Sequence, residues 1–445
     1  MNETASSGLI LAGMQSSGGK TALTCMLLAA LAERGLVVQP FKVGPDFIDP
    51  GYHSRFAGTA SRNLDAWMMG IDGIAREAAA YGAGKISIVE GVMGLFDGSD
   101  VRSDEGSTME VARLLDWPVV LVITCAKAGR SVAAALRGFV EEAGHGRIAG
   151  VILNEVSGSG HGEYLSKAIA PLKIPVLGIV PYCEELAWPE RHLGLQASQE
   201  RAFPARKELA QLAEKHLDLP RILAMLSSAP AQTSAGMTSA NHRRIGVARD
   251  EAFHFYYESN LDYLRRCGAE LVEFSPIHDS AMPNGIDGVV FGGGFPEMYA
   301  DALSQNESLR AEIRSAVNAG LPCYAECGGL MLLAEELIAR DGTRYPMAGA
   351  VPGAVEMTVR LHHFGYCVCS GLAGTNGAEF RGHEFHHSRW QAETQTANLW
   401  TVRRKRLGSE RREGCARHNL HASYVHLYFS MSEAALRPLL RKASA

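Results

Sequence analysis

Cys327 stands where a short apolar run ends and a helix-forming run begins, in the segment Leu321-Pro-Cys-Tyr-Ala-Glu-Cys-Gly-Gly-Leu-Met-Leu-Leu333. The pattern predicts a sharp strand-to-helix turn that directs the sulfur toward the amides of Gly328 and Gly329 and the positive end of the helix. Such surroundings favour a thiolate and can supply an oxyanion hole, as a catalytic nucleophile requires. Many cysteines are instead buried structural residues, so this segment alone leaves both interpretations open.

A second chemical motif, Gly13-Met-Gln-Ser-Ser-Gly-Gly-Lys20-Thr21, follows the first apolar run and opens a helical pattern. Backbone amides of such a loop point at phosphate oxygens, Lys20 reaches the terminal phosphates, and the Thr21 hydroxyl can bind Mg²⁺. The first glycine is one residue further from the lysine than usual, so an ordinary glycine turn is the alternative. Asn154, after a later strand, is a candidate for reading the purine edge. The residues that we expect at the nucleotide are therefore Gly13, Ser17, Gly18, Gly19, Lys20, Thr21 and Asn154.

Charged side chains follow two further predicted strands, at the edge where ligands bind in open α/β sheets. Lys42, Asp46 and Asp49 lie in one segment that leaves a strand, and Glu90 and Asp97 lie in another. Carboxylates at this edge are suited to hold Mg²⁺. The alternative is that the aspartates cap turns in loops rich in glycine and proline.

The composition is that of an ordinary globular protein of 445 residues, with 47% hydrophobic and 20% charged residues. The length exceeds what one hydrophobic core usually supports, which predicts two domains, with three as the alternative. A net charge of −5 gives no reason to expect a nucleic-acid or membrane partner, and no apolar run is long enough to span a bilayer. Nine cysteines without a Cys-x-x-Cys pair fit a reducing compartment, so we expect a cytoplasmic protein.

Strand-like apolar runs alternate with helical patterns, which favours an α/β fold with parallel sheets covered on both faces by helices. The first series of predicted strands is Leu9–Ala12, Val37–Lys42, Ile86–Val89, Val119–Thr124, Ala149–Leu153 and Val176–Val180. The second series is Ile245–Ala248, Glu270–Phe274, Gly288–Phe291, Cys323–Ala325 and Gly365–Cys369. A small, polar stretch between them is typical of a linker, so we expect domains at residues 1–226 and 244–438, joined by residues 227–243.

These motifs together resemble the cobyrinic acid a,c-diamide synthase family over nearly the whole chain. In the first half, the resembling segments are Phe41-Lys-Val-Gly-Pro-Asp-Phe-Ile-Asp-Pro50, Ser61-Arg-Asn-Leu-Asp-Ala-Trp-Met68, Glu90-Gly-Val-Met-Gly-Leu-Phe-Asp-Gly98 and Pro189-Glu-Arg-His-Leu-Gly194. In the second half they are Gly292-Gly-Gly-Phe-Pro-Glu297, Ala325-Glu-Cys-Gly-Gly-Leu330, Arg381-Gly-His-Glu-Phe385 and Ala422-Ser-Tyr-Val-His-Leu427. The resemblance implies two doubly wound domains: a P-loop domain similar to dethiobiotin synthetase and a class I glutamine amidotransferase domain.

The resemblance implies a glutamine-hydrolysing carbon–nitrogen ligase that amidates the a and c acetate groups of cobyrinate in cobalamin biosynthesis. ATP would activate each carboxylate as an acyl phosphate, with Mg²⁺ as cofactor, and ammonia would displace the phosphate. We assign Thr21, Asp46 and Glu90 to Mg²⁺. The residues that we assign to the substrate and phosphoryl group are Lys42, Asp46 and Asp97.

In the amidotransferase domain the resemblance implies that Cys327 attacks glutamine and that His426 is its base. The oxyanion hole would consist of glycine amides, and its candidates are Gly293, Gly294 and Gly328. Two residues after the histidine stands Tyr428, where many class I amidotransferases carry an acid. The sequence therefore predicts a Cys–His pair and names no third partner.

Histidines gather in the same half, at His362, His363, His383, His386 and His387. The spacing of His383 and His387 could place two metal-binding rings on one helical face. Because the segment is bounded by glycine and is expected to be strand or loop, we favour a role in substrate contact or at a domain interface.

Two closely related reactions stay open, with hydrogenobyrinate or nickel-sirohydrochlorin as the substrate, because those synthases share nearly every motif. Cobyric acid synthase differs, since its N-terminal segments lack Gly-Pro-Asp-Phe-Ile-Asp. A non-enzymatic alternative is a nucleotide-dependent binding module with a degenerate amidotransferase domain, but the presence of Cys327 and His426 argues against it.

The expected partners are small molecules, and the sequence leaves the oligomeric state open, a homodimer included.

Overall fold

The computed structural model describes residues 6–186, 190–191, 194–195, 204–228, 242–372, 377–393, 395–405 and 408–440. Contacts divide the chain into two compact units, Met1–Ala235 and Gly236–Ala445. The division falls inside the predicted linker, of which residues 229–241 lie outside the described ranges, as does part of the motif at residues 189–194. In the described parts of the chain, no helix has both the length and the apolar content to cross a membrane.

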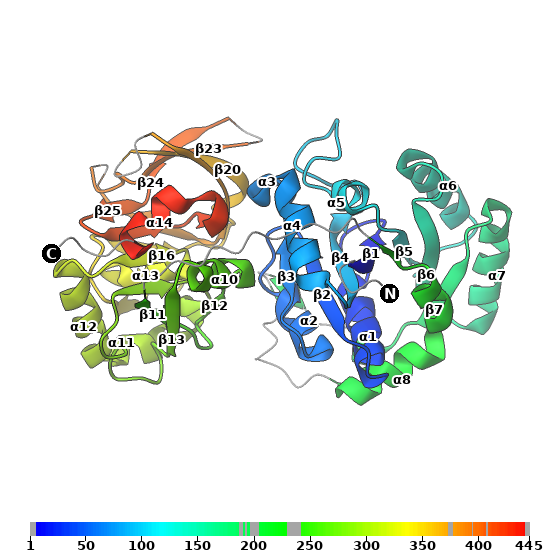
Figure 1. The fold of residues 1–445 in the computed structure, drawn as a ribbon, viewed down its shortest axis with the longest axis horizontal. Coiled ribbons are helices and arrows are strands. Elements are labelled where there is room, and N and C mark those ends of the chain that lie inside the picture. The colour runs from blue at the N-terminus through cyan, green and yellow to red at the C-terminus, as the bar shows by residue number, and fades with distance from the viewer. Residues whose placement is uncertain are drawn as a thin grey trace. The chain divides into compact units, whose positions relative to one another are not determined.

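The first unit is built on a sheet of eight strands, seven of which run parallel in the order β3-β2-β4-β1-β5-β6-β7 (Figure 1). These strands are β1 (Ser7–Gly13), β2 (Val38–Val43), β3 (Arg62–Leu64), β4 (Ile86–Gly94), β5 (Val119–Thr124), β6 (Ile148–Val156) and β7 (Val176–Pro181). The eighth strand, β10 (Ser227–Ser228), pairs antiparallel with β1. It corrects the predicted linker, because the first two linker residues belong to this sheet.

Helices connect the strands of the first unit, and they are α1 (Lys20–Glu33), α2 (Asp49–Ala57), α3 (Ala66–Met69), α4 (Ile71–Gly82), α5 (Thr108–Leu115), α6 (Ser131–Ala143), α7 (Ser159–Ile169), α8 (Arg206–His216) and α9 (Leu219–Ala224). Helix α1 is buried continuously from Ala22 to Leu31, and its apolar side chains share one core cluster with those of the sheet and of α8. The chain leaves β1 toward β2 but leaves β4 toward β5, so the strand order reverses beside β1. Ligands of open α/β sheets bind at such a reversal, beyond the carboxyl ends of the strands.

The second unit contains a six-stranded sheet in the order β13-β11-β14-β16-β26-β25, parallel except for its last pair. Its strands are β11 (Arg243–Ala248), β13 (Ala269–Phe274), β14 (Gly288–Phe291), β16 (Cys323–Glu326), β25 (Cys415–Arg417) and β26 (Leu420–Ser423). The helices are α10 (Glu258–Arg266), α11 (Ala300–Gln305), α12 (Glu307–Asn318), α13 (Gly328–Leu333) and α14 (Glu433–Leu440). Each predicted strand of both series overlaps an observed strand, which confirms the two-domain α/β prediction.

Three further sheets of the described second unit were not predicted, and the smallest pairs β12 (Phe253–Phe255) with β15 (Gly293–Gly294). A five-stranded antiparallel sheet consists of β20 (His363–Gly371), β21 (Glu379–His386), β23 (Trp400–Arg404), β24 (Glu410–Glu413) and β27 (His426–Leu427). A four-stranded sheet consists of β17 (Glu336–Ile338), β18 (Arg344–Pro346), β19 (Ala354–Met357) and β22 (Ser388–Gln391). Between β26 and β27 the chain crosses from the parallel sheet to the antiparallel sheet within three residues, which brings a histidine beside the end of β16.

Candidate active sites

The predicted strand-to-helix turn at Cys327 is present. Strand β16 ends at Glu326, helix α13 begins at Gly328, and Cys327 between them has φ 49° and ψ −101°. A non-glycine residue pays a conformational cost in this region, and such strain is found mostly where function requires it. The Cys327 amide donates a hydrogen bond of 2.7 Å to the Ser423 carbonyl of the neighbouring strand β26, so the turn is tied to the sheet.

His426 lies within hydrogen-bond reach of the Cys327 thiol. Burial alone would lower the pKa of the imidazole, but hydrogen bonds and charge interactions with Cys327 and Glu326 raise it to about 10. Both neighbours therefore favour the charged form of the ring, and an imidazolium beside a sulfur is the arrangement that activates a cysteine nucleophile. The structure brings together the two residues that the sequence assigned to glutamine hydrolysis.

Glu326 is a buried side chain of this site that the sequence prediction missed. Its Oε2 lies 3.2 Å from Nδ1 of His426, and its Oε1 accepts the Leu427 amide at 3.0 Å and the Tyr324 hydroxyl at 2.5 Å. The prediction looked for an acid two residues after the histidine, where Tyr428 is buried instead. The available signal was the glutamate immediately before the cysteine.

The three glycines predicted for an oxyanion hole gather around the same pair. A Cβ on Gly328 would lie 3.1 Å from the Gly294 amide nitrogen, and one on Gly293 would lie 2.8 Å from Cε1 of His426. Gly328 is the first residue of α13, so its amide has no acceptor within the helix. The backbone can approach a reacting carbonyl closely here, and the oxyanion hole stays a prediction.

The clustered histidines lie on or beside β20 and β21, as the strand interpretation expected. His386 stacks on Tyr424 at a ring distance of 3.8 Å, and His383 lies 5.1 Å from the His426 ring. Among the residues that the structure describes, no group of three or more His, Cys, Asp or Glu side chains is arranged to hold a metal ion. Strand β21 places His383 beside His426 of the thiol site, and the segment does not form the helical face that the metal interpretation required.

The predicted phosphate loop joins β1 to α1 in the first unit. Lys20 is the first residue of α1, and its ammonium donates to the Gln15 carbonyl at 3.1 Å. Burial, together with the nearby Lys42 charge, lowers the pKa of Lys20 to about 8. Its described hydrogen bond is to a backbone carbonyl of its own loop, and a buried cation held in this way is suited to bind phosphate.

Asn154 supports this loop from β6. Its amide donates to the Gly18 carbonyl at 3.1 Å, and a Cβ on Gly19, which has φ 80°, would lie 2.3 Å from its nitrogen. Ser17 also has a positive φ, of 54°. A contact between Asn154 and a purine stays a prediction, since the described contacts are with the loop.

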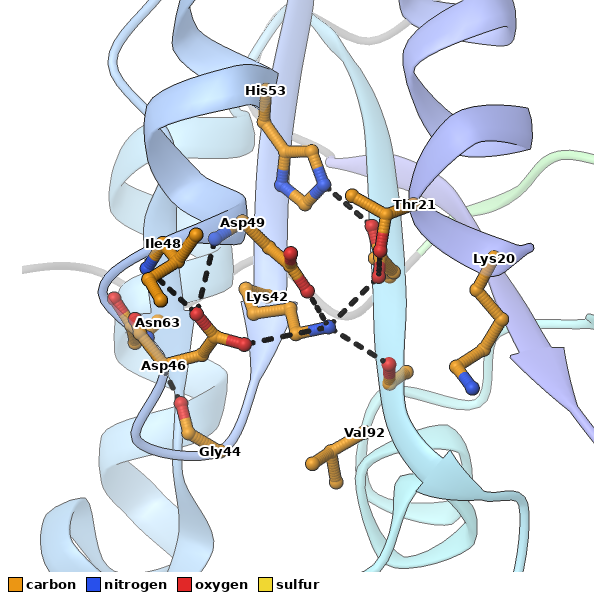
Figure 2. Close-up of polar contacts among 12 residues, drawn as sticks. Lys20, Thr21, Lys42, Gly44, Asp46, Ile48, Asp49, His53, Asn63 and Val92 are labelled. Atoms are coloured by element: carbon orange, nitrogen blue, oxygen red, sulfur yellow. Dashed lines mark hydrogen bonds and ion pairs between the residues drawn. The ribbon is translucent and has the colours of Figure 1, made fainter. Parts of the chain in front are cut away.

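Lys42 lies at the centre of a buried acidic cluster beside that loop. Figure 2 shows its ammonium between the aspartates that follow β2 and the strand β4. The nitrogen lies 2.5 Å from Asp49, 2.8 Å from Glu90 and 3.9 Å from Asp46, and it also donates to the Gly91 carbonyl at 3.2 Å. Burial would lower the pKa of Lys42, but the three carboxylates raise it well above the usual range.

Both carboxylate oxygens of Glu90 are held by neighbouring side chains. Oε1 accepts the Thr21 hydroxyl and the Lys42 ammonium, each at 2.8 Å, and Oε2 lies 2.6 Å from Nε2 of His53. Burial would raise the pKa of this carboxyl, whereas the Lys42 and His53 charges and hydrogen bonds lower it well below its usual range. Thr21 and Glu90 therefore meet as the magnesium assignment requires, but His53 was not predicted.

The aspartates of these loops also hold turns, as the alternative interpretation expected. Asp46 accepts the amides of Ile48 and Asp49 at 2.8 and 3.0 Å, and Asp97 accepts the Gly94 amide at 2.8 Å. Turn capping leaves one oxygen of each carboxylate for another partner. The assignments of Asp46 and Asp97 to the metal or substrate stay predictions.

The cluster fits magnesium in its chemistry. Mg²⁺ prefers hard oxygen ligands, and Thr21, Glu90 and Asp46 supply one hydroxyl and two carboxylates. The Lys42 ammonium lies 2.8 Å from Glu90 and 3.9 Å from Asp46, so magnesium would share these two carboxylates with an existing positive charge.

Comparison with known protein families assigns a class to each unit. The family described as "CobQ/CobB/MinD/ParA nucleotide binding domain" matches residues 9–195, and the "CobB/CobQ-like glutamine amidotransferase domain" matches residues 244–434. A nucleotide-binding domain joined to a glutamine amidotransferase domain defines an amide-forming ligase that takes its nitrogen from glutamine.

Two curated relatives identify the family within that class. "Cobyrinate a,c-diamide synthase" of Syntrophotalea carbinolica is 43% identical over 444 residues, covering 96% of this chain and 97% of the relative. The protein of the same name from Priestia megaterium is 40% identical over 436 residues, covering 95% and 94%. The chain belongs to the cobyrinate a,c-diamide synthase family.

Proposed function

We propose that the protein uses ATP and glutamine to convert the a and c acetate carboxylates of cobyrinate to amides, the reaction that the names of its relatives describe. The observation that carries the proposal is the presence, in one chain, of a phosphate loop backed by buried acids and of a Cys327–His426 pair on a strand-to-helix turn. The first arrangement suits activation of a carboxylate, and the second suits release of ammonia.

The glutaminase half of the reaction follows from the pairing of His426 with Cys327. The thiolate attacks the side-chain carbonyl carbon of glutamine, the carbon–nitrogen bond breaks, and His426 gives its proton to the departing nitrogen. Water then hydrolyses the thioester to glutamate and frees the thiol. Amides at Gly293, Gly294 and Gly328 would stabilise the oxyanion of each addition step.

The synthetase half begins with a carboxylate oxygen of the substrate attacking the γ-phosphorus of ATP, which releases ADP and forms an acyl phosphate. Ammonia then attacks the acyl carbon and phosphate leaves. Lys20 balances charge on the phosphates, while Lys42 and Asp97 would position the substrate carboxylate. Magnesium, held by Thr21, Asp46 and Glu90, would supply charge neutralisation of the nucleotide phosphates.

The identity of the tetrapyrrole is tested with purified enzyme, ATP, glutamine and each of three substrates: cobyrinate, hydrogenobyrinate and nickel-sirohydrochlorin. We expect the highest kcat/KM and a diamide product with cobyrinate. A clear preference for either of the others would assign that reaction to the protein instead. Nucleotide hydrolysis that none of the three substrates stimulates would favour the binding-module alternative.

Replacement of Cys327 tests whether glutamine hydrolysis and carboxylate activation take place at separate sites. We expect Cys327→Ala to abolish glutamine-supported amidation and glutamate release, while amidation with ammonium salts continues, because the acyl phosphate still forms. Cys323→Ala is a matched control, since this buried cysteine lies on the same strand four residues earlier and should leave both activities intact. If Cys327→Ala also removes the ammonium-supported activity, the thiol has a structural role.

A further inference from the structure

Glu326 and Cys327 are adjacent in the chain, yet both side chains contact His426. Neighbouring residues of a regular strand point to opposite faces, so this arrangement is not expected at the end of a strand. The positive φ of 49° at Cys327 breaks the alternation and turns the sulfur toward the ring. One turn therefore supplies two of the groups around the histidine.

Two hydrogen-bond donors besides the imidazole hold the Glu326 carboxylate in place. Its Oε1 accepts the Tyr324 hydroxyl, from the same face of β16, and the backbone amide of Leu427. Its Oε2 faces Nδ1 of His426 at 3.2 Å. Glu326 thus holds both the ring and the adjacent backbone of β27. Because Nδ1 is engaged by the carboxylate, Nε2 is the nitrogen that remains for the sulfur.

Other buried glutamates of the second unit have different partners. Glu413 accepts the Ser423 hydroxyl at 2.6 Å and the Tyr424 amide at 2.8 Å, and burial raises the pKa of its carboxyl to about 7. Glu384 pairs with Arg411 and lies 3.7 Å from His386. In the described part of this unit, Glu326 is the buried glutamate whose described contacts include His426.

We propose that Glu326 is the positioning acid of the glutaminase site: it fixes the tautomer and orientation of His426 and stabilises the imidazolium during attack by Cys327. Glu326, the last residue of β16, would take the role that an acid two positions after the histidine is expected to take in many class I amidotransferases. The inference rests on the proposed glutaminase function of Cys327, and it adds to that function the third partner that the sequence did not reveal.

The test compares Glu326→Gln with Glu413→Gln, two isosteric changes of equally buried glutamates in one domain. Glutamate release from glutamine is measured without tetrapyrrole, so the result does not depend on the identity of the substrate. We expect Glu326→Gln to lower kcat for glutamate release by about 10²- to 10⁴-fold, with a much smaller change in KM, because the amide favours the wrong tautomer. Amidation with ammonium salts should persist in both variants, and Glu413→Gln should keep glutamine-supported activity.

A second measurement separates positioning from packing. The rate of iodoacetamide alkylation of the Cys327 peptide is followed against pH by mass spectrometry, because it reports the thiolate. We expect the midpoint of this profile to move to higher pH in Glu326→Gln, since an imidazolium that has lost its carboxylate partner gives up its proton more easily and supports the thiolate less. In Glu413→Gln the profile should match that of the wild type.

An unchanged kcat and an unchanged alkylation profile in Glu326→Gln would overturn the proposal, and so would equal losses in both glutamine variants. If Glu326→Gln does not fold, Tyr324→Phe removes one donor that orients the same carboxylate and should lower kcat for glutamate release by a smaller factor; an unchanged kcat there would also overturn the proposal. Glutamate release by Cys327→Ala at the wild-type rate would instead contradict the proposed function itself, so the two failures are distinguishable.

Discussion

At the scale of single residues, each site centres on a buried charge with several partners. Glu90 has both oxygens occupied, with Thr21 and Lys42 on one and His53 on the other. A buried carboxylate stays ionised only when its partners offset the cost of removing it from water. His53 is a fully buried residue of α2, and its second nitrogen lies 3.4 Å from the Ser61 hydroxyl, so its ring orientation is held from both ends.

We expect His53→Leu to impair the synthetase half alone. Loss of the contact leaves one Glu90 oxygen without a partner, which should lower ammonium-supported amidation by about 10- to 100-fold and destabilise the fold by about 1–3 kcal/mol. Glutamate release should be unaffected. His53→Gln is the matched control, because its side-chain amide can still donate to the carboxylate and should recover part of the activity. Equal amidation rates in wild type and His53→Leu would contradict this role.

The sequence was sufficient to predict those functional residues that are marked by the pattern of adjacent residues in the chain. Cys327 and the Lys20 loop lie at strand-to-helix transitions, and the patterns of apolar residues, glycines and helix formers mark such transitions clearly. Glu326 and His53 were missed for a physical reason. Their roles depend on which strand lies beside them, and the pairing of β16 with β26, of β21 with β27, or of β2 with β4 leaves no trace in the local pattern.

At the scale of elements, both sites lie at a strand-to-helix turn: Cys327 stands between β16 and α13, and Lys20 opens α1 after the glycine turn that follows β1. Helix α13 packs closely on the sheet because a glycine in its first turn faces backbone. A Cβ on Gly329, in the first turn of α13, would lie 2.4 Å from the Phe291 carbonyl oxygen of β14. The short distance leaves no room for any other residue type.

We therefore expect Gly329→Ala to destabilise the protein by about 1–3 kcal/mol and to displace the thiol turn. Gly138→Ala provides the contrast, because a Cβ there, within α6, meets nothing within 4 Å and should stabilise the helix by about 0.5–1 kcal/mol. Urea unfolding of the full-length variants gives both values. A stability of Gly329→Ala equal to that of the wild type would show that β14 and α13 can separate without cost.

The parallel sheets were predictable because buried strands alternate with long amphipathic helices. The other sheets of the second unit were not, apart from one strand within β20. Most of their strands have five residues or fewer, and β27 contains only His426 and Leu427, so little periodicity can develop. In the segment from 336 to 427, the sequence therefore predicted the catalytic residue His426 but little of the structure around it.

At the scale of the whole molecule, each of the two units has its own parallel sheet and its own candidate active site. In each unit the functional residues lie beyond the carboxyl ends of parallel strands. The oligomeric state and the route that ammonia takes stay outside what the sequence predicts, because no local pattern encodes them.

We expect Lys20→Ala to separate the two activities. Loss of the ammonium at the phosphate loop should reduce ATP-dependent amidation about 100-fold or more, with either glutamine or ammonium salts as the nitrogen source, because charge on the phosphates is no longer balanced. Glutamate release should continue. Lys167→Ala is a suitable control, since this lysine is exposed and pairs with Glu163 on the surface of α7. Normal ATP turnover in Lys20→Ala would reject the phosphate loop.

The strained backbone at Cys327 has a consequence for how such a protein can be improved. Glycine adopts a positive φ at little cost, whereas the cysteine pays about 1–3 kcal/mol for it. Selection of random variants for thermal resistance alone would therefore accumulate glycine at this position and discard the thiol. Any evolution of a more durable enzyme from this chain has to include glutamine consumption in the screen, because the most stable sequence and the working sequence differ at that residue.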